Sequence, residues 1–191
     1  MDRNPKYLTY LVKHLIIPAV FAGLNLHGIY AQEEVYRTSS GLLIIKANFD
    51  GQIVNINSRK LLILLDYETG KVVMKQEFSA LTSENDSIQS KLNIMKNEYI
   101  QFEGKLGLDY INTLGHPPLK FHVEGTMYPG NKPVLGTGHL EHIGQGATIA
   151  CLLSLTFKLR ADDVFPDHFL EGFDNEIYVT VLQSLLPRVG D

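Results

Sequence analysis

Alternation of hydrophobic and polar residues dominates this chain from residue 41 onward. Successive side chains of a β-strand point to opposite faces, so a period of two predicts strands with one buried face. The alternation is clearest at residues 99–108, 119–127, 151–159 and 177–181. In the first of these segments, apolar Ile100, Phe102 and Leu106 alternate with polar residues. We expect the four apolar faces to line one common core.

Weaker strands are predicted between and before these four segments. They lie at residues 42–47, 52–57, 61–65, 72–78 and 134–141. Residues 68–70 and 128–131 contain the Gly and Pro residues typical of hairpin turns, whereas two prolines at residues 112–118 predict a longer loop. Short connections favour antiparallel neighbours.

One helix interrupts the series of strands. Ile88, Leu92 and Met95 have the spacing of one helix face. The capping residues are expected among Thr82, Ser83 and Asp86. Eight or nine strands with one short helix predict an all-β fold, an antiparallel barrel of eight to nine strands, because closure removes exposed strand edges. A β-sandwich is the alternative architecture.

The N-terminal segment has the layout of a secretory signal peptide. Basic residues precede an apolar run at 15–26, and the small residue Ala31 follows. The run is shorter than the roughly 20 apolar residues of a transmembrane helix. We therefore expect residues 1–31 to be a signal peptide and residues 32–191 to form a secreted barrel. An uncleaved membrane anchor and a buried N-terminal segment are the alternatives.

Charge and cysteine content narrow the classes of partner. The chain has 17 Lys and Arg against 21 Asp and Glu, with a net charge of −4. This balance does not favour broad electrostatic binding to nucleic acid or to an anionic membrane. One cysteine, Cys151, excludes an internal disulfide and a zinc site built from CxxC pairs. Its place on a predicted strand indicates a buried structural thiol.

Candidate metal ligands and catalytic residues do not form a recognisable set. The histidines closest together in sequence are His116, His122, His139 and His142. Imidazole is a common metal ligand, but His139 and His142 are expected on opposite faces of one strand. We therefore expect solvated surface histidines and no metal site. The sequence also lacks hydrolase, metalloprotease and P-loop motifs, and the acids at 162–167 lack the spacing of a calcium loop.

Strand parity assigns side chains to the interior of the predicted barrel. An eight-stranded barrel can be filled by its own side chains or can hold one small ligand. The interior faces carry long aliphatic and aromatic residues, so an occupant is expected to be apolar or to have an apolar tail. The candidate lining consists of Phe102, Leu106, Phe121, Val123, Leu153, Leu155, Phe157, Val179 and Val181. An ordinary packed core is the alternative for the same residues.

Several segments of the chain resemble YceI-like proteins. Residues 123–134, VEGTMYPGNKPV, are similar to the Val-x-Gly pair, short turn and Lys-Pro-Val of that family. Residues 155–166 and 176–186 resemble its last two strands, and residues 64–78 resemble its early hairpin. The turn differs, because residues 128–130 read Tyr-Pro-Gly where the family commonly has Thr, His and Gly.

This resemblance implies a lipocalin-like barrel, secreted to the periplasm, that binds an isoprenoid chain in its interior. The ligand is expected to be a polyprenyl lipid or a quinone tail, and no catalytic residue or other cofactor is implied. We therefore expect a lipid-binding protein that is not an enzyme. One alternative is a filled barrel with a structural, interaction or stress-related role, and another is a secreted enzyme. The oligomeric state stays open, with a homodimer as one alternative.

Overall fold

The computed structural model describes residues 35–108, 111, 116–143 and 150–188. These residues form the strands β1 (Val35–Phe49), β2 (Gln52–Asp66), β3 (Lys71–Glu77), β4 (Thr82–Ser83), β5 (Tyr99–Leu106), β6 (Leu119–Tyr128), β7 (Lys132–Ile143), β8 (Ala150–Arg160) and β9 (Phe173–Pro187). The α-helix α3 (Asp86–Ile94) precedes β5. The short 3-10 helices are η2 (Phe78–Ala80), η3 (Ala161–Asp163) and η4 (Asp167–Phe169). The predicted signal peptide lies outside the described residues.

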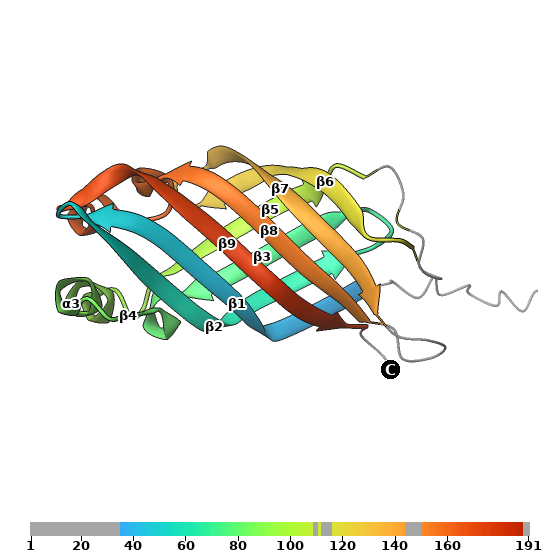
Figure 1. Ribbon diagram of the computed structural model, residues 1–191, viewed down its shortest axis with the longest axis horizontal. Coiled ribbons are helices and arrows are strands. Elements are labelled where there is room, and N and C mark those ends of the chain that lie inside the picture. The colour runs from blue at the N-terminus through green and yellow to red at the C-terminus, as the bar shows by residue number, and fades with distance from the viewer. Residues whose placement is uncertain (1–34, 109–110, 112–115, 144–149, 189–191) are drawn as a thin grey trace, which may run out of the picture. The chain divides into compact units, whose positions relative to one another are not determined.

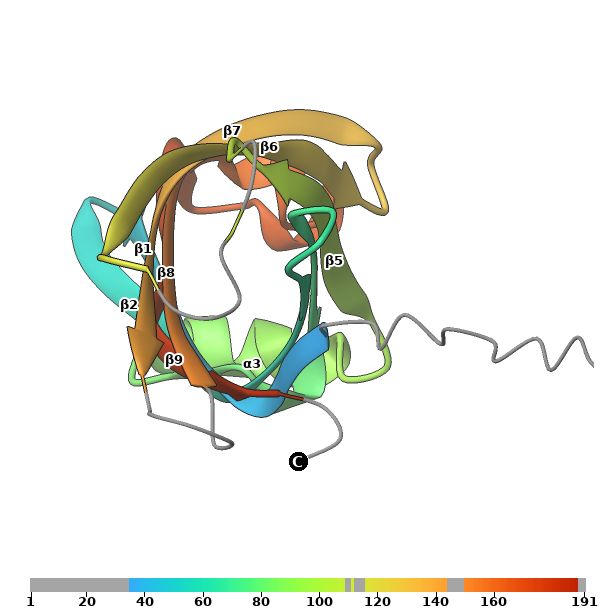
Figure 2. The same cartoon turned by 90° about the vertical axis from the view of Figure 1, so that its right-hand side faces the viewer.

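Eight of these strands close an antiparallel barrel (Figures 1 and 2). The order around the ring is β1-β9-β8-β7-β6-β5-β3-β2, and pairing between β1 and β2 completes it. The short strand β4 lies outside the ring and pairs with Ile56 and Asn57 of β2. The prediction of an all-β barrel with one short helix is therefore confirmed. The sandwich alternative is wrong, because all nine described strands belong to one closed sheet.

The first hairpin is longer than the alternation predicts. The sequence predicts separate strands at 52–57 and 61–65, whereas β2 runs through both without a break. The register between β1 and β2 shifts around Gly41, so the alternation is interrupted although the strand continues. A Cβ atom at Gly41 would lie 2.9 Å from the carbonyl oxygen of Leu61, so glycine permits the close approach of the two strands at this bulge.

The inner faces of the strands supply the core. The apolar residues predicted to face inward on β5, β6, β8 and β9 are buried within the strands, except that Leu119 at the start of β6 is partly buried. Their polar neighbours on β6, such as Lys120, His122 and Glu124, are exposed. The predicted hairpin turns at 68–70 and 128–131 are also confirmed, since they join β2 to β3 and β6 to β7.

The helix α3 lies at one end of the barrel, at the left of Figure 1. Its N-cap is Asn85, whose Oδ1 accepts a hydrogen bond from the backbone N–H of Ile88 at 3.1 Å. The expectation that Thr82, Ser83 or Asp86 caps the helix is therefore wrong, because the helix begins at Asp86 and the cap is the residue before it. As predicted, Ile88 and Leu92 are buried.

An aromatic cluster closes the same end. Phe169 stacks on both Phe165 and Phe173, with ring centroids 4.4 and 5.2 Å away, and the rings of Phe165 and Phe173 also meet at 5.6 Å. Lys91 of α3 donates to the carbonyl oxygens of Phe169 and Glu171 at 3.1 and 2.8 Å, which connects the helix to the segment between β8 and β9. This end of the barrel is thus packed with side chains.

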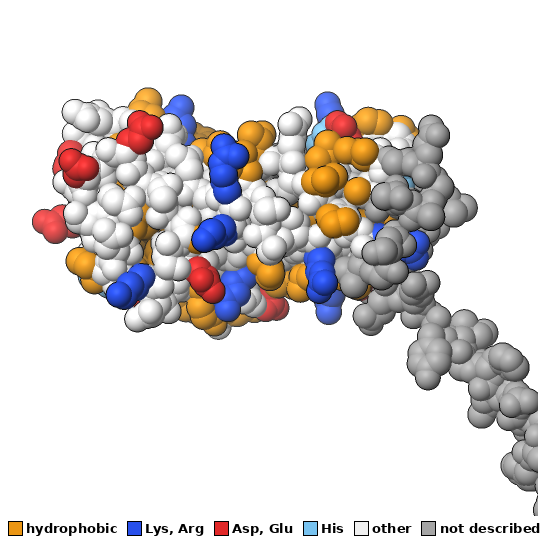
Figure 3. Space-filling model, turned by 90° about the horizontal axis from the view of Figure 1, so that it is seen from below, with side chains coloured by type: hydrophobic (Ala, Val, Ile, Leu, Met, Phe, Trp, Pro, Cys, Tyr) orange, Lys and Arg blue, Asp and Glu red, His pale blue; other side chains and the backbone are white. Residues whose placement is uncertain are grey.

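The outer surface is of mixed character. Figure 3 shows one face, on which Lys and Arg side chains lie among Asp and Glu, and apolar side chains gather toward one end. The exposed apolar residues of the barrel strands include Leu62, Leu135, Leu182 and Leu185. In the described part of the chain, no helix has the length and apolar character needed to cross a membrane.

The barrel interior as candidate binding site

All nine candidate lining residues lie inside the barrel. They are Phe102, Leu106, Phe121, Val123, Leu153, Leu155, Phe157, Val179 and Val181, and none is more than 7% exposed. They come from β5, β6, β8 and β9. These strands are neighbours in the ring, with β7 between β6 and β8. Burial fits a ligand lining and an ordinary core equally well, because both keep apolar side chains out of water.

A small cavity lies between these walls. Its volume is about 30 Å³, which is room for a water molecule rather than for a lipid chain. The residues around it are Leu43, Leu61, Met74, Gln76, Ile100, Gln101, Phe102, Met127, Phe157, Val179 and Val181. Four of the nine candidates therefore border the cavity, and the other five pack in the surrounding core.

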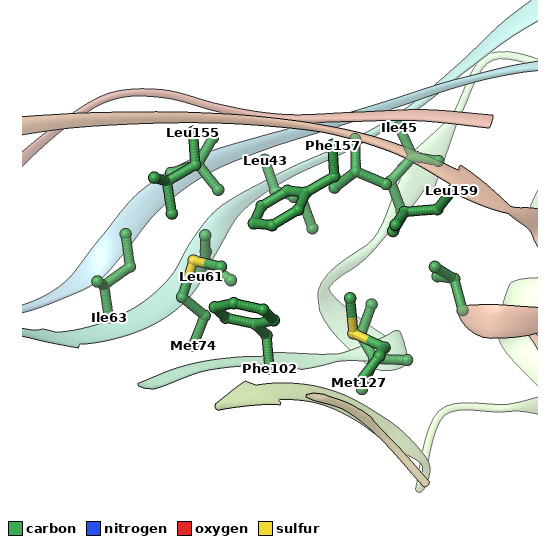
Figure 4. Packing of buried hydrophobic residues seen from close by; sticks show 14 of the residues in the cluster. Leu43, Ile45, Leu61, Ile63, Met74, Phe102, Met127, Leu155, Phe157 and Leu159 are labelled. Atoms are coloured by element: carbon green, nitrogen blue, oxygen red, sulfur yellow. The ribbon is translucent and has the colours of Figure 1, made fainter. Parts of the chain in front are cut away.

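Two walls face one another across the interior (Figure 4). Met74, Phe102 and Met127 are neighbours across β3, β5 and β6, because each pair is directly opposed in the strand register. Leu43 and Phe157 lie on the facing wall. The rings of Phe102 and Phe157 meet with centroids 5.2 Å apart and planes tilted by 58°, so the two walls touch at this point.

Inward-facing glycines make room for these rings. Gly104 and Gly125 oppose one another in the register of β5 and β6. A Cβ atom at Gly104 would lie 2.3 Å from Cζ of Phe102, and one at Gly125 would lie 2.7 Å from Cε2 of the same ring. The Phe102 ring therefore occupies the space that two side chains would otherwise fill.

The same arrangement recurs on β7. A Cβ atom at Gly138 would lie 2.1 Å from the ring of Phe121. A Cβ atom at Gly136 would lie 2.6 Å from the ring of Phe157. Three of the candidate aromatic residues are thus seated on glycines of neighbouring strands. Sequence reasoning places Gly104 on the apolar face but does not pair any glycine with a ring, since that pairing depends on the strand register.

Gln76 is a polar residue of the interior that the alternation of side chains did not identify. It follows Val72 and Met74 on the inward face of β3, is buried, and borders the cavity. Its Nε2 donates to the carbonyl oxygen of Glu77 at 2.8 Å. The signal that could have found it is its position, because a glutamine occupies an inward place in an otherwise apolar strand face.

A second polar group lies at the end of the barrel opposite α3. His142 is paired with the fully buried Cys151 in the register of β7 and β8, so its ring belongs to the inner face. The ring of His116 contacts it edge-on, with centroids 5.3 Å apart. Nδ1 of His142 is buried without a hydrogen-bond partner among the described residues.

These positions correct one expectation and confirm two others. His139 and His142 do lie on opposite faces, and His139 pairs outside the barrel with Glu141 at 3.4 Å. The expectation of four solvated histidines is wrong for His142, whose half-buried ring faces inward, and for His116, whose Nε2 is also buried. Cys151 is a buried thiol, as predicted, and burial raises its pKa to about 12. Among the described residues, no three His, Cys, Asp or Glu side chains are placed to hold a metal ion.

The stability of the barrel is expected to depend on the protonation of His142. Burial lowers the pKa of His142 below 6.5, and the nearby His116 lowers it further. The unfolded chain therefore takes up a proton at a higher pH than the folded chain does. The resulting stabilisation is present above pH 6.5 and is lost as the pH falls through the lowered native pKa.

Urea unfolding across this pH range measures the effect. The variant His142→Gln is expected to lose part of the acid dependence of the free energy of unfolding, whereas His139→Gln, on the outer face, is expected to retain it. Identical pH profiles for wild type and His142→Gln would contradict the assignment.

Comparison with known proteins shows similarity at the level of structure. No family model and no curated protein matches this sequence. A polyisoprenoid-binding domain from Saccharophagus degradans, implicated in plant cell wall breakdown, matches with a TM-score of 0.61 and 9% identity, over 82% of this chain and 99% of that domain. BcnA from Burkholderia cenocepacia matches with a TM-score of 0.50 and 10% identity, over 78% of this chain and 95% of BcnA. This chain therefore has the fold of a polyisoprenoid-binding domain, as its resemblance to YceI-like proteins implies.

Proposed function

We propose that this protein binds the isoprenoid chain of a lipid inside its barrel, without catalysis, in the periplasm or outside the cell. The observation that carries the proposal is the barrel fold shared with a polyisoprenoid-binding domain. The apolar interior supports it, because such a wall suits a chain without polar groups. The signal-peptide layout of residues 1–31 supports the secreted location.

Binding requires that the interior open. This cavity of about 30 Å³ is too small for an isoprenoid chain, so binding at this place requires that side chains of its wall move. Met74 and Met127 are suited to this movement because methionine is unbranched and adapts to irregular space. The contact between Phe102 and Phe157 must also separate.

Burial of the apolar chain supplies the driving force for binding. Burying apolar surface stabilises a complex by about 25 cal/mol per Å², so a chain that buries about 400 Å² gains on the order of 10 kcal/mol. Separating one pair of aromatic rings costs about 0.5–1.5 kcal/mol. This value is counted beyond the area that the two rings bury, so opening the Phe102–Phe157 contact also costs the packing of that area.

The small cavity also favours a second candidate function. A barrel whose interior is filled by its own side chains can serve as a structural or interaction protein. In that case, partners would use the outer surface rather than the interior.

Native mass spectrometry separates the two functions. Protein expressed from the full sequence in a secreting bacterium is measured intact, and its bound material is extracted with organic solvent. A stoichiometric isoprenoid is the expected result. A protein that keeps its bare mass, even after incubation with quinones and polyprenyl lipids, would favour the filled barrel.

A pair of matched variants locates the bound chain. Val181→Phe adds volume at the cavity wall, whereas Leu182→Phe adds the same ring on the outer surface, where Leu182 is 41% exposed. Only Val181→Phe is expected to lower lipid occupancy, by roughly tenfold, and circular dichroism verifies that both variants are folded. Equal occupancy in the two variants would contradict binding in the interior.

A further inference from the structure

Gln76 has an incomplete set of hydrogen bonds among apolar side chains of the barrel interior. Its side chain is 1% exposed and borders the cavity. Its Oε1 atom is buried and accepts no hydrogen bond from any described residue. Burying an amide oxygen without a partner is unfavourable, because the oxygen loses its hydrogen bonds to water. This position therefore needs a donor that the described residues do not supply.

The orientation of the amide is determined by its other end. Nε2 of Gln76 donates to the carbonyl oxygen of Glu77 at 2.8 Å. Turning the amide over would place its oxygen against that carbonyl oxygen, which is unfavourable because both groups are acceptors. The atom left for a ligand is thus an acceptor.

No described residue around Gln76 donates to Oε1. Ile100 is its partner in the register of β5, and most of the cavity wall is aliphatic, aromatic or methionine. Gln101 also borders the cavity, but its Nε2 donates to Glu103 at 2.6 Å. A molecule with a donor group that enters the cavity, water included, would supply this hydrogen bond.

We propose that Oε1 of Gln76 accepts a hydrogen bond from the hydroxyl group of the bound lipid, so that the barrel prefers an isoprenoid alcohol to a quinone. The inference rests on the proposed function. A hydroxyl group can donate to Oε1, whereas a quinone carbonyl or an ether oxygen can only accept. Gln76 is the penultimate residue of β3, next to η2. The hydroxyl group therefore lies toward the α3 end of the barrel, and the chain extends past Met74 toward the opposite end.

A competition experiment tests this preference. Protein expressed from the full sequence and freed of bound lipid is mixed with equal amounts of geranylgeraniol, its methyl ether and the corresponding hydrocarbon. The ether keeps the oxygen but has no hydrogen to donate. The hydrocarbon is smaller than the alcohol, so steric exclusion does not explain its loss. Native mass spectrometry then measures how much of each molecule is bound.

The alcohol is expected to occupy the barrel roughly ten times more than either competitor, which is the factor that one net hydrogen bond supplies. In Gln76→Met, which has a similar length but no acceptor, this ratio is expected to fall to about one. Gln52→Met is the matched control, because Gln52 is exposed at the start of β2. Its ratio is expected to equal that of the wild type.

The outcomes distinguish this inference from the proposed function. If the wild-type protein binds all three molecules equally, the role of Gln76 is overturned while lipid binding stands. If it binds none of them, both are overturned. A ratio that stays near ten in Gln76→Met would also overturn the role of Gln76. Should that variant fail to fold, the wild-type ratio alone decides.

Discussion

Replacing Leu155 with aspartate is expected to unfold the barrel, whereas replacing its neighbour Thr156 with lysine is expected to leave it folded. Leu155 is 1% exposed on the inner face of β8, opposite Gly138 and Val181 in the strand register. Thr156 faces the solvent. An unpaired carboxylate inside the barrel costs several kcal/mol, which is comparable with the roughly 5–15 kcal/mol that stabilises a typical domain.

Urea unfolding followed by circular dichroism measures this difference. Leu155→Asp is expected to show no folded baseline or a greatly reduced midpoint, and Thr156→Lys is expected to unfold close to the wild type. Retention of isoprenoid should follow the same order. If the two variants unfold at the same midpoint and retain the same amount of lipid, the assignment of Leu155 to the interior is wrong.

Gly125→Ala is expected to lower the free energy of unfolding by about 3 kcal/mol. A Cβ atom at Gly125 would lie 2.3 Å from the carbonyl oxygen of Glu103 and 2.6 Å from Cα of Gly104. Both are backbone atoms of β5, so they cannot move away without separating β5 from β6. The ring of Phe102, 2.7 Å from the same point, would also have to leave its place on the two glycines.

Gly130→Ala is the matched control for this substitution. Gly130 lies in the turn between β6 and β7, and the atom nearest to a Cβ there is Cγ of Lys132 at 3.3 Å. That flexible side chain can move, so the expected change in stability is within about 0.5 kcal/mol. Equal destabilisation of the two variants would show that the loss comes from glycine replacement in general and not from the contact between β5 and β6.

The Gly125 substitution also bears on ligand binding. The ring of Phe102 lies on Gly104 and Gly125 and contacts Phe157 across the interior. A lipid chain that enters the barrel must separate Phe102 from Phe157. The packing of Phe102 on the two glycines therefore helps to hold the interior closed when no lipid is bound. If Gly125→Ala folds, we therefore expect it to alter lipid occupancy as well as stability.

The alternation of side chains was enough to predict the apolar residues that lie inside on β5, β6, β8 and β9. On β6, for example, Phe121 and Val123 are buried and His122 is exposed, as expected. This succeeds because the two faces of a strand are defined by its own backbone, and a core needs apolar side chains on one of them. The apolar seam of α3 was predicted for the same local reason, since Ile88 and Leu92 follow the helical repeat.

Pairing between strands was beyond the reach of that pattern. The bulge at Gly41, where β1 and β2 change register, made one long strand look like two. The packing of the aromatic rings on glycines depends on the strand register, which places Gly104 opposite Gly125. The inward orientation of His142 likewise follows from its pairing with Cys151, which the sequence does not show.

The sequence by itself therefore determined the strand faces, the all-β class and the apolar character of the interior, because these follow from local periodicity. Only the tertiary structure decided how closely the residues around Phe102 and Phe157 pack, with a cavity of about 30 Å³ between them, and which polar atom borders that cavity. Cavity volume and the hydrogen bonds of Gln76 depend on the packing of side chains from many strands at once. That packing is set by closure and register, which the alternation along a single strand does not contain.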